Sequence, residues 1–195
     1  MAIDFMVMPI SRYISGDFVT PAMRSSWEQG IPYFVLGPDG KRDLPPGLPF
    51  GGAGATEYRG RIVDMVLDDL RELPSQIARA LWDERSAEEP RIQRVDADSY
   101  QALLEFFAGR NSRSLFGLRK TDKTAHCTSQ VILPCDFQDP IPLTSPFERI
   151  AGSTTQALKE LASCKFPDTA RAAAGTLRDA LEDSAELRLP LIVDC

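Results

Sequence analysis

The sequence predicts an α+β fold: a single globular domain over residues 1–195, with a mixed or mostly antiparallel sheet packed by about five helices. Short apolar runs with strand-like spacing mix irregularly with amphipathic helical segments, whereas a doubly wound sheet requires regular βαβ alternation. The 195 residues are 43% apolar and 26% charged, which suffices for one core without disulfides. No run of about 18 apolar residues is present, so no membrane-spanning helix is expected.

The first third of the chain carries the signals of a strand, a short helix and a hairpin. Residues 3–7 alternate between apolar and other side chains, as expected of a half-buried strand. Thr20 suits the N-cap position of a helix, and Pro21 suits its first turn. Strands are expected at 33–36 and 41–44, on either side of a turn that contains glycine and proline.

The strongest helical pattern covers residues 57–73. Apolar residues recur there at spacings of three and four, and they form a stripe more than three turns long. The stripe consists of Ile62, Val63, Val66, Leu67, Leu70 and Leu73. The other expected elements are a helix at 98–109 opened by an Asp98–Gln101 capping box, strands at 114–118 and 129–134, a proline-rich extended segment at 134–147, helices capped by Ser153 and Asp168, and a last strand at 189–193.

Charge is distributed unevenly along the chain. The net charge is −6; residues 56–90 and 136–195 each carry −4, whereas residues 91–135 carry +3. An acidic protein lacks the basic field that general nucleic-acid binding requires, so nucleic acid is not expected as a partner. The first residues lack the basic region of a signal peptide, and four cysteines in a chain of this length are typical of reduced thiols. We therefore expect a cytoplasmic protein.

The nearest approach to a phosphate-binding motif is the glycine- and proline-rich loop at 37–55. A Walker loop needs Lys followed by Ser or Thr, but Gly54 is followed by Ala, Thr and Glu. A dinucleotide fingerprint needs three spaced glycines after a strand, and Gly52 and Gly54 supply only the first half. Backbone amides together with Arg59 could still form an anion-binding nest at the start of the helix. A loop of this length is otherwise a connection or a contact loop.

A local basic patch offers a second place for phosphate contact. Arg119 and Lys120 belong to a cluster of cations around Phe116, and arginines interleaved with an aromatic suit stacking and phosphate binding. This patch and the glycine-rich loop support an alternative function, that of an enzyme acting on a nucleotide or another phosphate-bearing substrate. A solvated hairpin face is the simpler interpretation of the patch.

Metal and thiol chemistry find little support in the sequence. His126 is the only histidine, so a two-histidine metal site is excluded, and no C-x-x-C spacing occurs. His126 and Cys127 are neighbours, and adjacent residues of an extended segment point to opposite sides, which disfavours a catalytic dyad. No G-x-S-x-G motif is present. We expect no catalytic residues, no cofactor and no metal ion.

The most suggestive feature is the polar face of the helix expected at 57–73. Asp64 and Asp68, and then Asp68 and Glu72, are like-charge pairs four residues apart, with Asp69 beside them. Each such pair destabilises an isolated helix by a few tenths of a kcal/mol, roughly. The cluster has three interpretations: a solvated surface, a site for a hard divalent cation with ligands from other elements, or a face that steers and holds a basic protein.

From these observations we expect a non-catalytic binding module for another protein with a basic surface. A bacterial immunity or antitoxin-like inhibitor is the concrete form of this hypothesis. Asp64, Asp68, Asp69 and Glu72 are the partner-binding residues that it names. The phosphate-substrate enzyme described above is the alternative, with Gly52, Gly54, Arg59, Arg119 and Lys120 as its binding residues. A subunit of a larger assembly is a third possibility.

Overall fold

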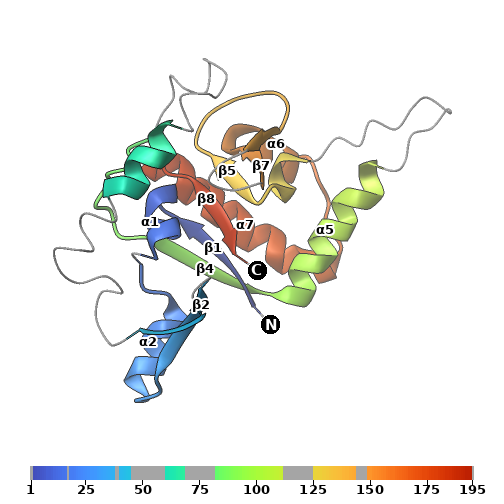
Figure 1. Cartoon of the computed structure of the whole chain (residues 1–195). Coiled ribbons are helices and arrows are strands. Elements are labelled where there is room, and N and C mark those ends of the chain that lie inside the picture. Colours follow the sequence, from blue (N-terminus) through green and yellow to red (C-terminus); the bar gives the residue numbers. More distant parts are fainter. Residues whose placement is uncertain are drawn as a thin grey trace.

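A six-stranded mixed sheet forms the centre of the protein (Figure 1). This computed structural model describes residues 2–16, 18–37, 40–44, 60–68, 82–111, 125–143 and 149–194. The strand order is β4-β1-β8-β5-β7-β6, and every neighbouring pair is antiparallel except β5 and β7. The strands are β1 (Ala2–Val7), β4 (Arg91–Asp96), β5 (Val131–Leu133), β6 (Ile141–Leu143), β7 (Arg149–Ser153) and β8 (Leu191–Asp194). The predicted α+β class with a mixed, mostly antiparallel sheet is confirmed.

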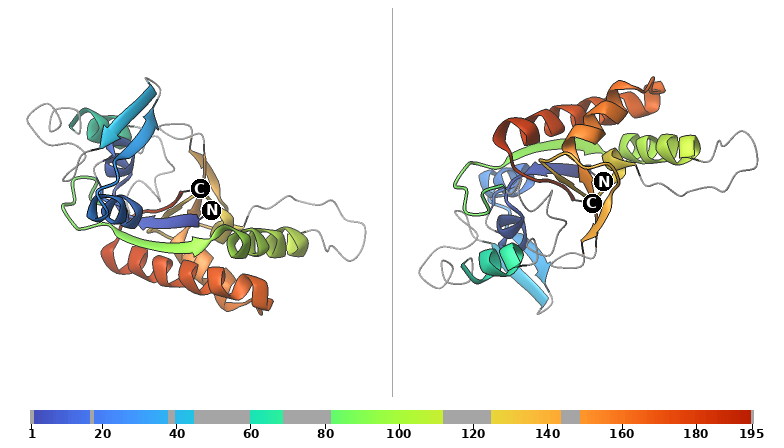
Figure 2. Two further views of the ribbon diagram at one scale, coloured as in Figure 1. Left: turned by 90° about the horizontal axis from the view of Figure 1, so that it is seen from below. Right: turned by 90° about the horizontal axis from the view of Figure 1, so that it is seen from above.

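Helices cover the two faces of this sheet unequally (Figure 2). One face, which we call the helical face, is covered by α5 (Ala97–Asn111), α6 (Thr154–Ala162) and α7 (Asp168–Leu187). The other face, which we call the α1 face, carries α1 (Ile10–Ser15) and a helix at residues 60–68. On that side α2 (Pro21–Glu28) leads into a separate hairpin of β2 (Tyr33–Gly37) and β3 (Gly40–Leu44). None of the helices in the described part of the chain has the length and apolar character needed to cross a membrane.

The helical face is packed by α7, whose buried side is rich in alanine. Small side chains at spacings of three and four let the helix axis approach the strands closely, while Leu177 and Leu181 fill the space between. Both leucines are fully buried. On the same face, Phe5 of β1 meets Tyr100 of α5 edge to face, with ring centroids 5.6 Å apart. This side of the molecule holds most of the apolar core.

The central strand β1 departs from the sequence-based expectation. The alternation of apolar and other side chains at residues 3–7 predicts that one face of the strand is exposed to solvent, but every residue of β1 after Ala2 is buried. Met6 is apolar and covered on the α1 face, and Asp4 is buried with a partner. Arg94 of β4 donates two hydrogen bonds to the Asp4 carboxylate, at 2.7 and 2.6 Å. The prediction of a half-buried strand is therefore wrong, because a paired charge can occupy a covered face of a sheet.

Local capping signals are confirmed in part. Thr20 accepts a hydrogen bond from the Met23 amide and caps α2, and Ser153 accepts one from the Gln156 amide and caps α6. The expected Asp98 cap is wrong: Asp96, two residues earlier, accepts the Ser99 amide at 2.8 Å and opens α5. The cap predicted at Asp168 is also wrong, because Pro167 is the N-cap of α7 and Asp168 is its first residue.

The proline-rich segment contains more regular structure than expected. β6 lies inside this segment and forms an edge of the sheet. Pro142 is tolerated there, because an edge strand can do without the backbone N–H that proline lacks. β7 was not predicted, because its five residues carry no strand-like alternation. β5 and the final strand β8 are confirmed, and β8 pairs on both sides inside the sheet. The strand expected at 114–118 and most of the loop 37–55 lie outside the described residues.

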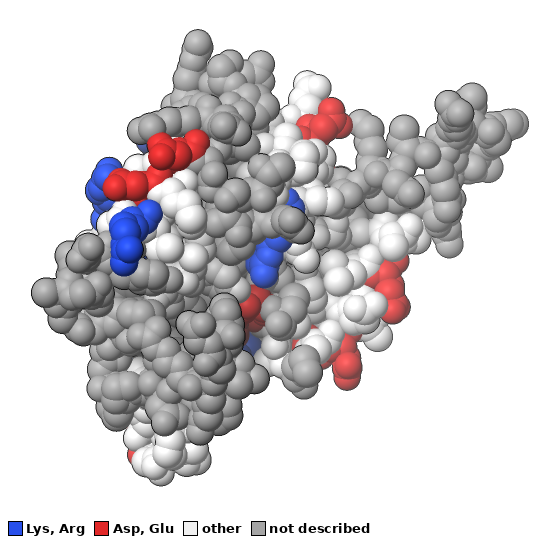
Figure 3. All heavy atoms as spheres, in the orientation of Figure 1, with Lys and Arg blue, Asp and Glu red and all other residues white. Residues whose placement is uncertain are grey.

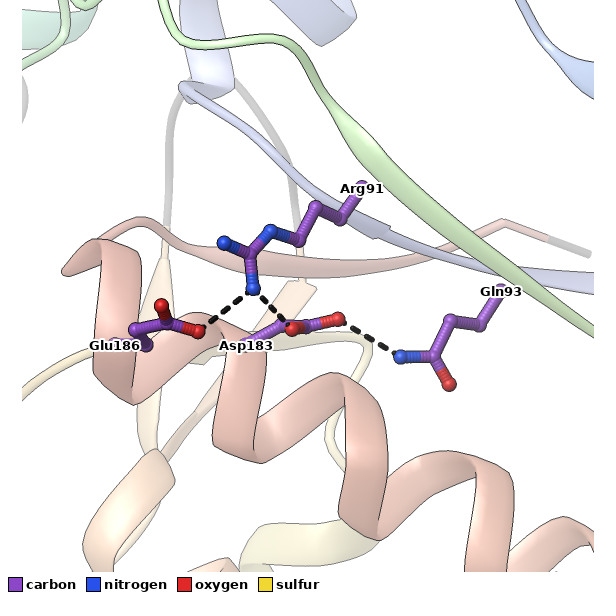
Figure 4. A network of polar contacts seen from close by, with 4 residues as sticks. All are labelled: Arg91, Gln93, Asp183 and Glu186. Atoms are coloured by element: carbon purple, nitrogen blue, oxygen red, sulfur yellow. Dashed lines mark hydrogen bonds and ion pairs between the residues drawn. The ribbon is translucent and has the colours of Figure 1, made fainter.

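A polar network ties the edge strand β4 to α7 (Figure 4). Nη1 of Arg91 lies 2.5 Å from Asp183 and 2.7 Å from Glu186, and the amide of Gln93 donates to Asp183 at 2.9 Å. The hydrogen bonds to Glu186 and Asp183 hold the pKa of Arg91 above its usual range. Arg91 and Gln93 are two residues apart and therefore share the helical face. The network fixes β4, which lies at the edge of the sheet in the described part of the chain.

Candidate functional site

The helix at residues 60–68 presents its carboxylates outward. Val63 and Val66 are buried, as the predicted apolar stripe requires, while Asp64 and Asp68 are exposed. Between the two carboxylates in sequence, Met65 is a large hydrophobic side chain that remains exposed, at 39%. The other two predicted partner-binding residues, Asp69 and Glu72, lie outside the described residues.

One of these carboxylates has a counter-ion that the sequence did not reveal. Asp64 lies 3.2 Å from a guanidinium nitrogen of Arg85, and both side chains are mostly exposed, at 71% and 67%. Such a solvated pair contributes about 0–1 kcal/mol to stability. Figure 3 shows acidic and basic side chains side by side on this part of the surface, at its upper left. The surface is therefore a mixture of charges around an apolar residue rather than an uninterrupted acidic face.

Arg85 belongs to a segment, residues 82–90, that leads into β4 and is anchored by a buried glutamate. Glu84 is 3% exposed. Its carboxylate accepts the backbone amides of Ile10 at 3.0 Å and Ser11 at 2.8 Å, and it also accepts the indole N–H of Trp82. The hydroxyl of Ser11 donates to the backbone carbonyl of Glu84 at 3.0 Å. A buried carboxylate with three donors is a satisfied anchor, so the segment is fixed against the start of α1.

The same segment makes two further contacts with the N-terminal helices. Arg12 of α1 donates to the backbone carbonyl of Glu88 at 2.5 Å. Arg24 of α2 lies 4.0 Å from the carboxylate of Glu89, and both side chains are largely exposed. Residues 82–90 therefore link α1, α2 and the helix at 60–68.

A cavity of about 840 Å³ lies between α1, α2 and this segment. Its size is in the range of small-ligand sites, about 300–1,000 Å³. Its wall contains two aromatic rings, two cations, two carboxylates and several small or apolar side chains. The lining residues are Arg12, Phe18, Val19, Arg24, Ser25, Trp27, Glu28, Ala87, Glu89, Pro90 and Ile92. Binding sites for small ligands usually combine apolar walls with a few polar groups, and this open hollow contains both.

Tyr13 connects this cavity to the end of the central strand β8. Its ring stacks on Phe18, a cavity residue, at 5.9 Å and an interplanar angle of 6°, and its hydroxyl donates to Asp194 at 2.7 Å. Burial, followed by the hydrogen bond to Asp194, raises the pKa of Tyr13 to about 12, while the nearby Arg149 opposes that shift. At neutral pH the phenol is therefore a hydrogen-bond donor and not a general base.

His126 is a structural histidine in this fold. Its Nδ1 accepts the backbone amide of Ser153 at 2.9 Å, so the proton is on Nε2, which donates to the carbonyl of Gln138 at 3.0 Å. Gly152 is required beside it, because an added Cβ would lie 2.4 Å from the His126 carbonyl oxygen. Both ring nitrogens of His126 are engaged, so the ring joins two segments of backbone and has no lone pair left for a metal.

The neighbouring thiols are protected from reaction. Burial, followed by the charge of Glu160, raises the pKa of Cys127 far above its ordinary value, and burial with Asp136 raises that of Cys135 to about 11. Cys127, Cys135 and Cys164 are all unbridged. Within the described ranges, no group of three or more His, Cys, Asp and Glu side chains is placed to hold a metal ion.

The residues of the alternative phosphate site lie outside the described residues. They are Gly52, Gly54, Arg59, Arg119 and Lys120. The enzyme hypothesis that depends on them stays a prediction.

Sequence reasoning missed the elements that make this region a site. Glu84 and Trp82 lie more than 70 residues from α1, the helix to which they attach the segment. A repeating pattern of apolar residues cannot predict a contact over that distance in sequence. The available signal was Trp82 at the end of the apolar residues Ala80 and Leu81, since a tryptophan needs a surface against which it can be buried. Comparison of the chain with protein-family models, curated proteins and solved structures finds no match, so function is argued from the site alone.

Proposed function

We propose that this protein is a non-catalytic binding module that holds a partner protein with a basic surface through the outward side of residues 60–68. The exposure of Met65 between Asp64 and Asp68 is the observation that carries the proposal. An apolar side chain that can be buried by a partner supplies binding energy, and the flanking carboxylates supply orientation and a faster encounter. An immunity or antitoxin-like inhibitor of a basic effector is the concrete form.

The surroundings of these residues support a fixed binding surface. Val63 and Val66 attach the helix to the core, and the Asp64–Arg85 pair joins it to the segment 82–90, which Glu84 anchors in turn. A surface held in one conformation loses little entropy when it binds. The carboxylates of Asp83, Glu88 and Glu89 in this segment are exposed and extend the negative charge.

The test is affinity capture by the immobilised protein, followed by calorimetry with the captured partner. Reversing both charges (Asp64→Lys with Asp68→Lys) should abolish capture, and Met65→Ser should weaken binding of the identified partner about tenfold. The matched control reverses Asp179 and Glu182, two exposed carboxylates of α7 on the helical face. If the Asp64→Lys, Asp68→Lys variant captures the partner as well as the control variant does, this surface does not bind the partner.

A further inference from the structure

The cavity between α1, α2 and residues 82–90 contains two arginines and two glutamates, and these four charged side chains are not all paired. Among its cations, Arg12 is held by the Glu88 carbonyl at 2.5 Å, and Arg24 faces Glu89 at 4.0 Å. Both arginines therefore have protein partners. Within the described residues the side chain of Glu28 makes no hydrogen bond or ion pair, so the carboxylate that the cavity leaves uncompensated is Glu28. A ligand that gives the Glu28 carboxylate a counter-ion carries a positive charge.

The aromatic walls favour the same ligand. Trp27 precedes Glu28 on α2, and Phe18 comes from the loop before that helix. The face of an indole or phenyl ring attracts a cation, by about 0.5–1 kcal/mol at exposed sites and more when water is excluded. The stem of a lysine or arginine side chain is itself apolar and covers hydrophobic surface while its charged head reaches a carboxylate. Val19, Pro90 and Ile92 provide such surface here.

We propose that this cavity binds a lysine or arginine side chain of a partner protein, with its stem against Trp27 and Phe18 and its charged head at Glu28. A volume of about 840 Å³ also accommodates the backbone on either side of that residue. This site is distinct from the surface of Met65 and does not depend on the function proposed above, because Phe18, Trp27 and Glu28 take no part in that surface. A single basic partner contacting both would lie across residues 82–90.

The two tryptophans of the chain make the test specific for the cavity. In a spectrum of the ¹⁵N-labelled full-length protein, each indole N–H gives one signal, and Trp27→Phe assigns them. Trp27 lines the cavity, whereas the indole of Trp82 is buried against Glu84. The probe is an acetylated and amidated tripeptide, Leu-Arg-Leu, and its partner probe replaces arginine by citrulline, which is isosteric and uncharged.

We expect the arginine peptide to move the Trp27 signal in a saturable way and to leave the Trp82 signal in place. The citrulline peptide should bind at least about threefold more weakly, and Glu28→Gln should weaken the arginine peptide by a similar factor. Glu28→Lys should abolish binding. Glu182→Gln is the matched control, an exposed helical glutamate on the helical face, and should leave the affinity unchanged.

Three results would overturn the proposal. The first is a Trp27 signal that the arginine peptide does not move. The second is equal affinity for the arginine and citrulline peptides, which would make the cavity a site for apolar side chains only. The third is movement of the Trp27 signal by inorganic phosphate that becomes stronger in Glu28→Gln, which would identify Arg12 and Arg24 as an anion site.

Discussion

The two faces of the central sheet are held together in different ways. On the helical face, α7 lies along the strands through alanines and leucines that are completely buried. On the α1 face, residues 82–90 bury Trp82 and are otherwise attached through polar anchors: Glu84 to the start of α1, Arg12 to the carbonyl of Glu88, and Arg24 to Glu89. The cavity lies on this second face.

The difference shows where a fold can leave space for a ligand. Apolar packing fills its interior to the density of a crystal, so it leaves no opening of useful size. Polar anchors act at single points and fix elements at a distance from one another. A cavity between α1, α2 and residues 82–90 is stable because Glu84 holds the segment without filling the space beside it.

The largest expected effect concerns the helical face. Leu177→Ala removes a side chain with 0% exposure at the centre of α7, and should lower the free energy of unfolding by about 2–5 kcal/mol. Urea denaturation followed by circular dichroism measures this change. Arg178→Ala, one residue further along and exposed, should change stability by no more than about 0.5 kcal/mol. Equal effects of the two substitutions would contradict apolar packing as the basis of this face.

The second effect concerns the anchor of the α1 face. Glu84→Gln keeps the shape of the side chain but replaces one acceptor with an amide donor that faces existing N–H groups. The expected loss is about 1–3 kcal/mol in the free energy of unfolding. Asp83→Asn, at an exposed neighbour, should be nearly neutral. Glu84→Gln should also move the Trp27 indole signal, because the segment that lines the cavity is no longer held in place. If the variant is stable and that signal does not move, the shape of the cavity does not depend on Glu84.

The same division explains which parts of the fold could be predicted from sequence. Apolar stripes and caps are local, so the helix at 60–68, α2 with its Thr20 cap, and α6 with its Ser153 cap were found correctly. Local sequence patterns mislead where a distant residue compensates the cost of burying a charged side chain. Asp4 occupies a buried face only because Arg94, 90 residues away, forms two hydrogen bonds with it.

The candidate site could be predicted only in part, for the same physical reason. The spacing of Asp64 and Asp68 along a helix places both on its outward side, and sequence suffices for that. Their environment depends on Arg85, which reaches Asp64 from 21 residues further along the chain. The cavity forms where α1, α2 and residues 82–90 come together, and neither residue spacing nor composition predicts that these segments are neighbours.

The smallest expected effect on stability concerns the titration of Tyr13, which tests a contact of the α1 face. Its pKa in the folded state is about 12, above the ordinary value of 10.0, so the stability linked to the neutral phenol is complete below pH 10 and is lost as the pH rises toward 12. The loss is modest, because the ring is only half-buried and solvent screens part of the interaction. Absorbance of tyrosinate against pH should contain a late-titrating contribution that is absent in Tyr13→Phe and shifted to lower pH in Asp194→Asn. If Tyr13→Phe leaves the curve above pH 10 unchanged, the hydroxyl is not held by Asp194, and the α1 face lacks the contact between Tyr13 and β8.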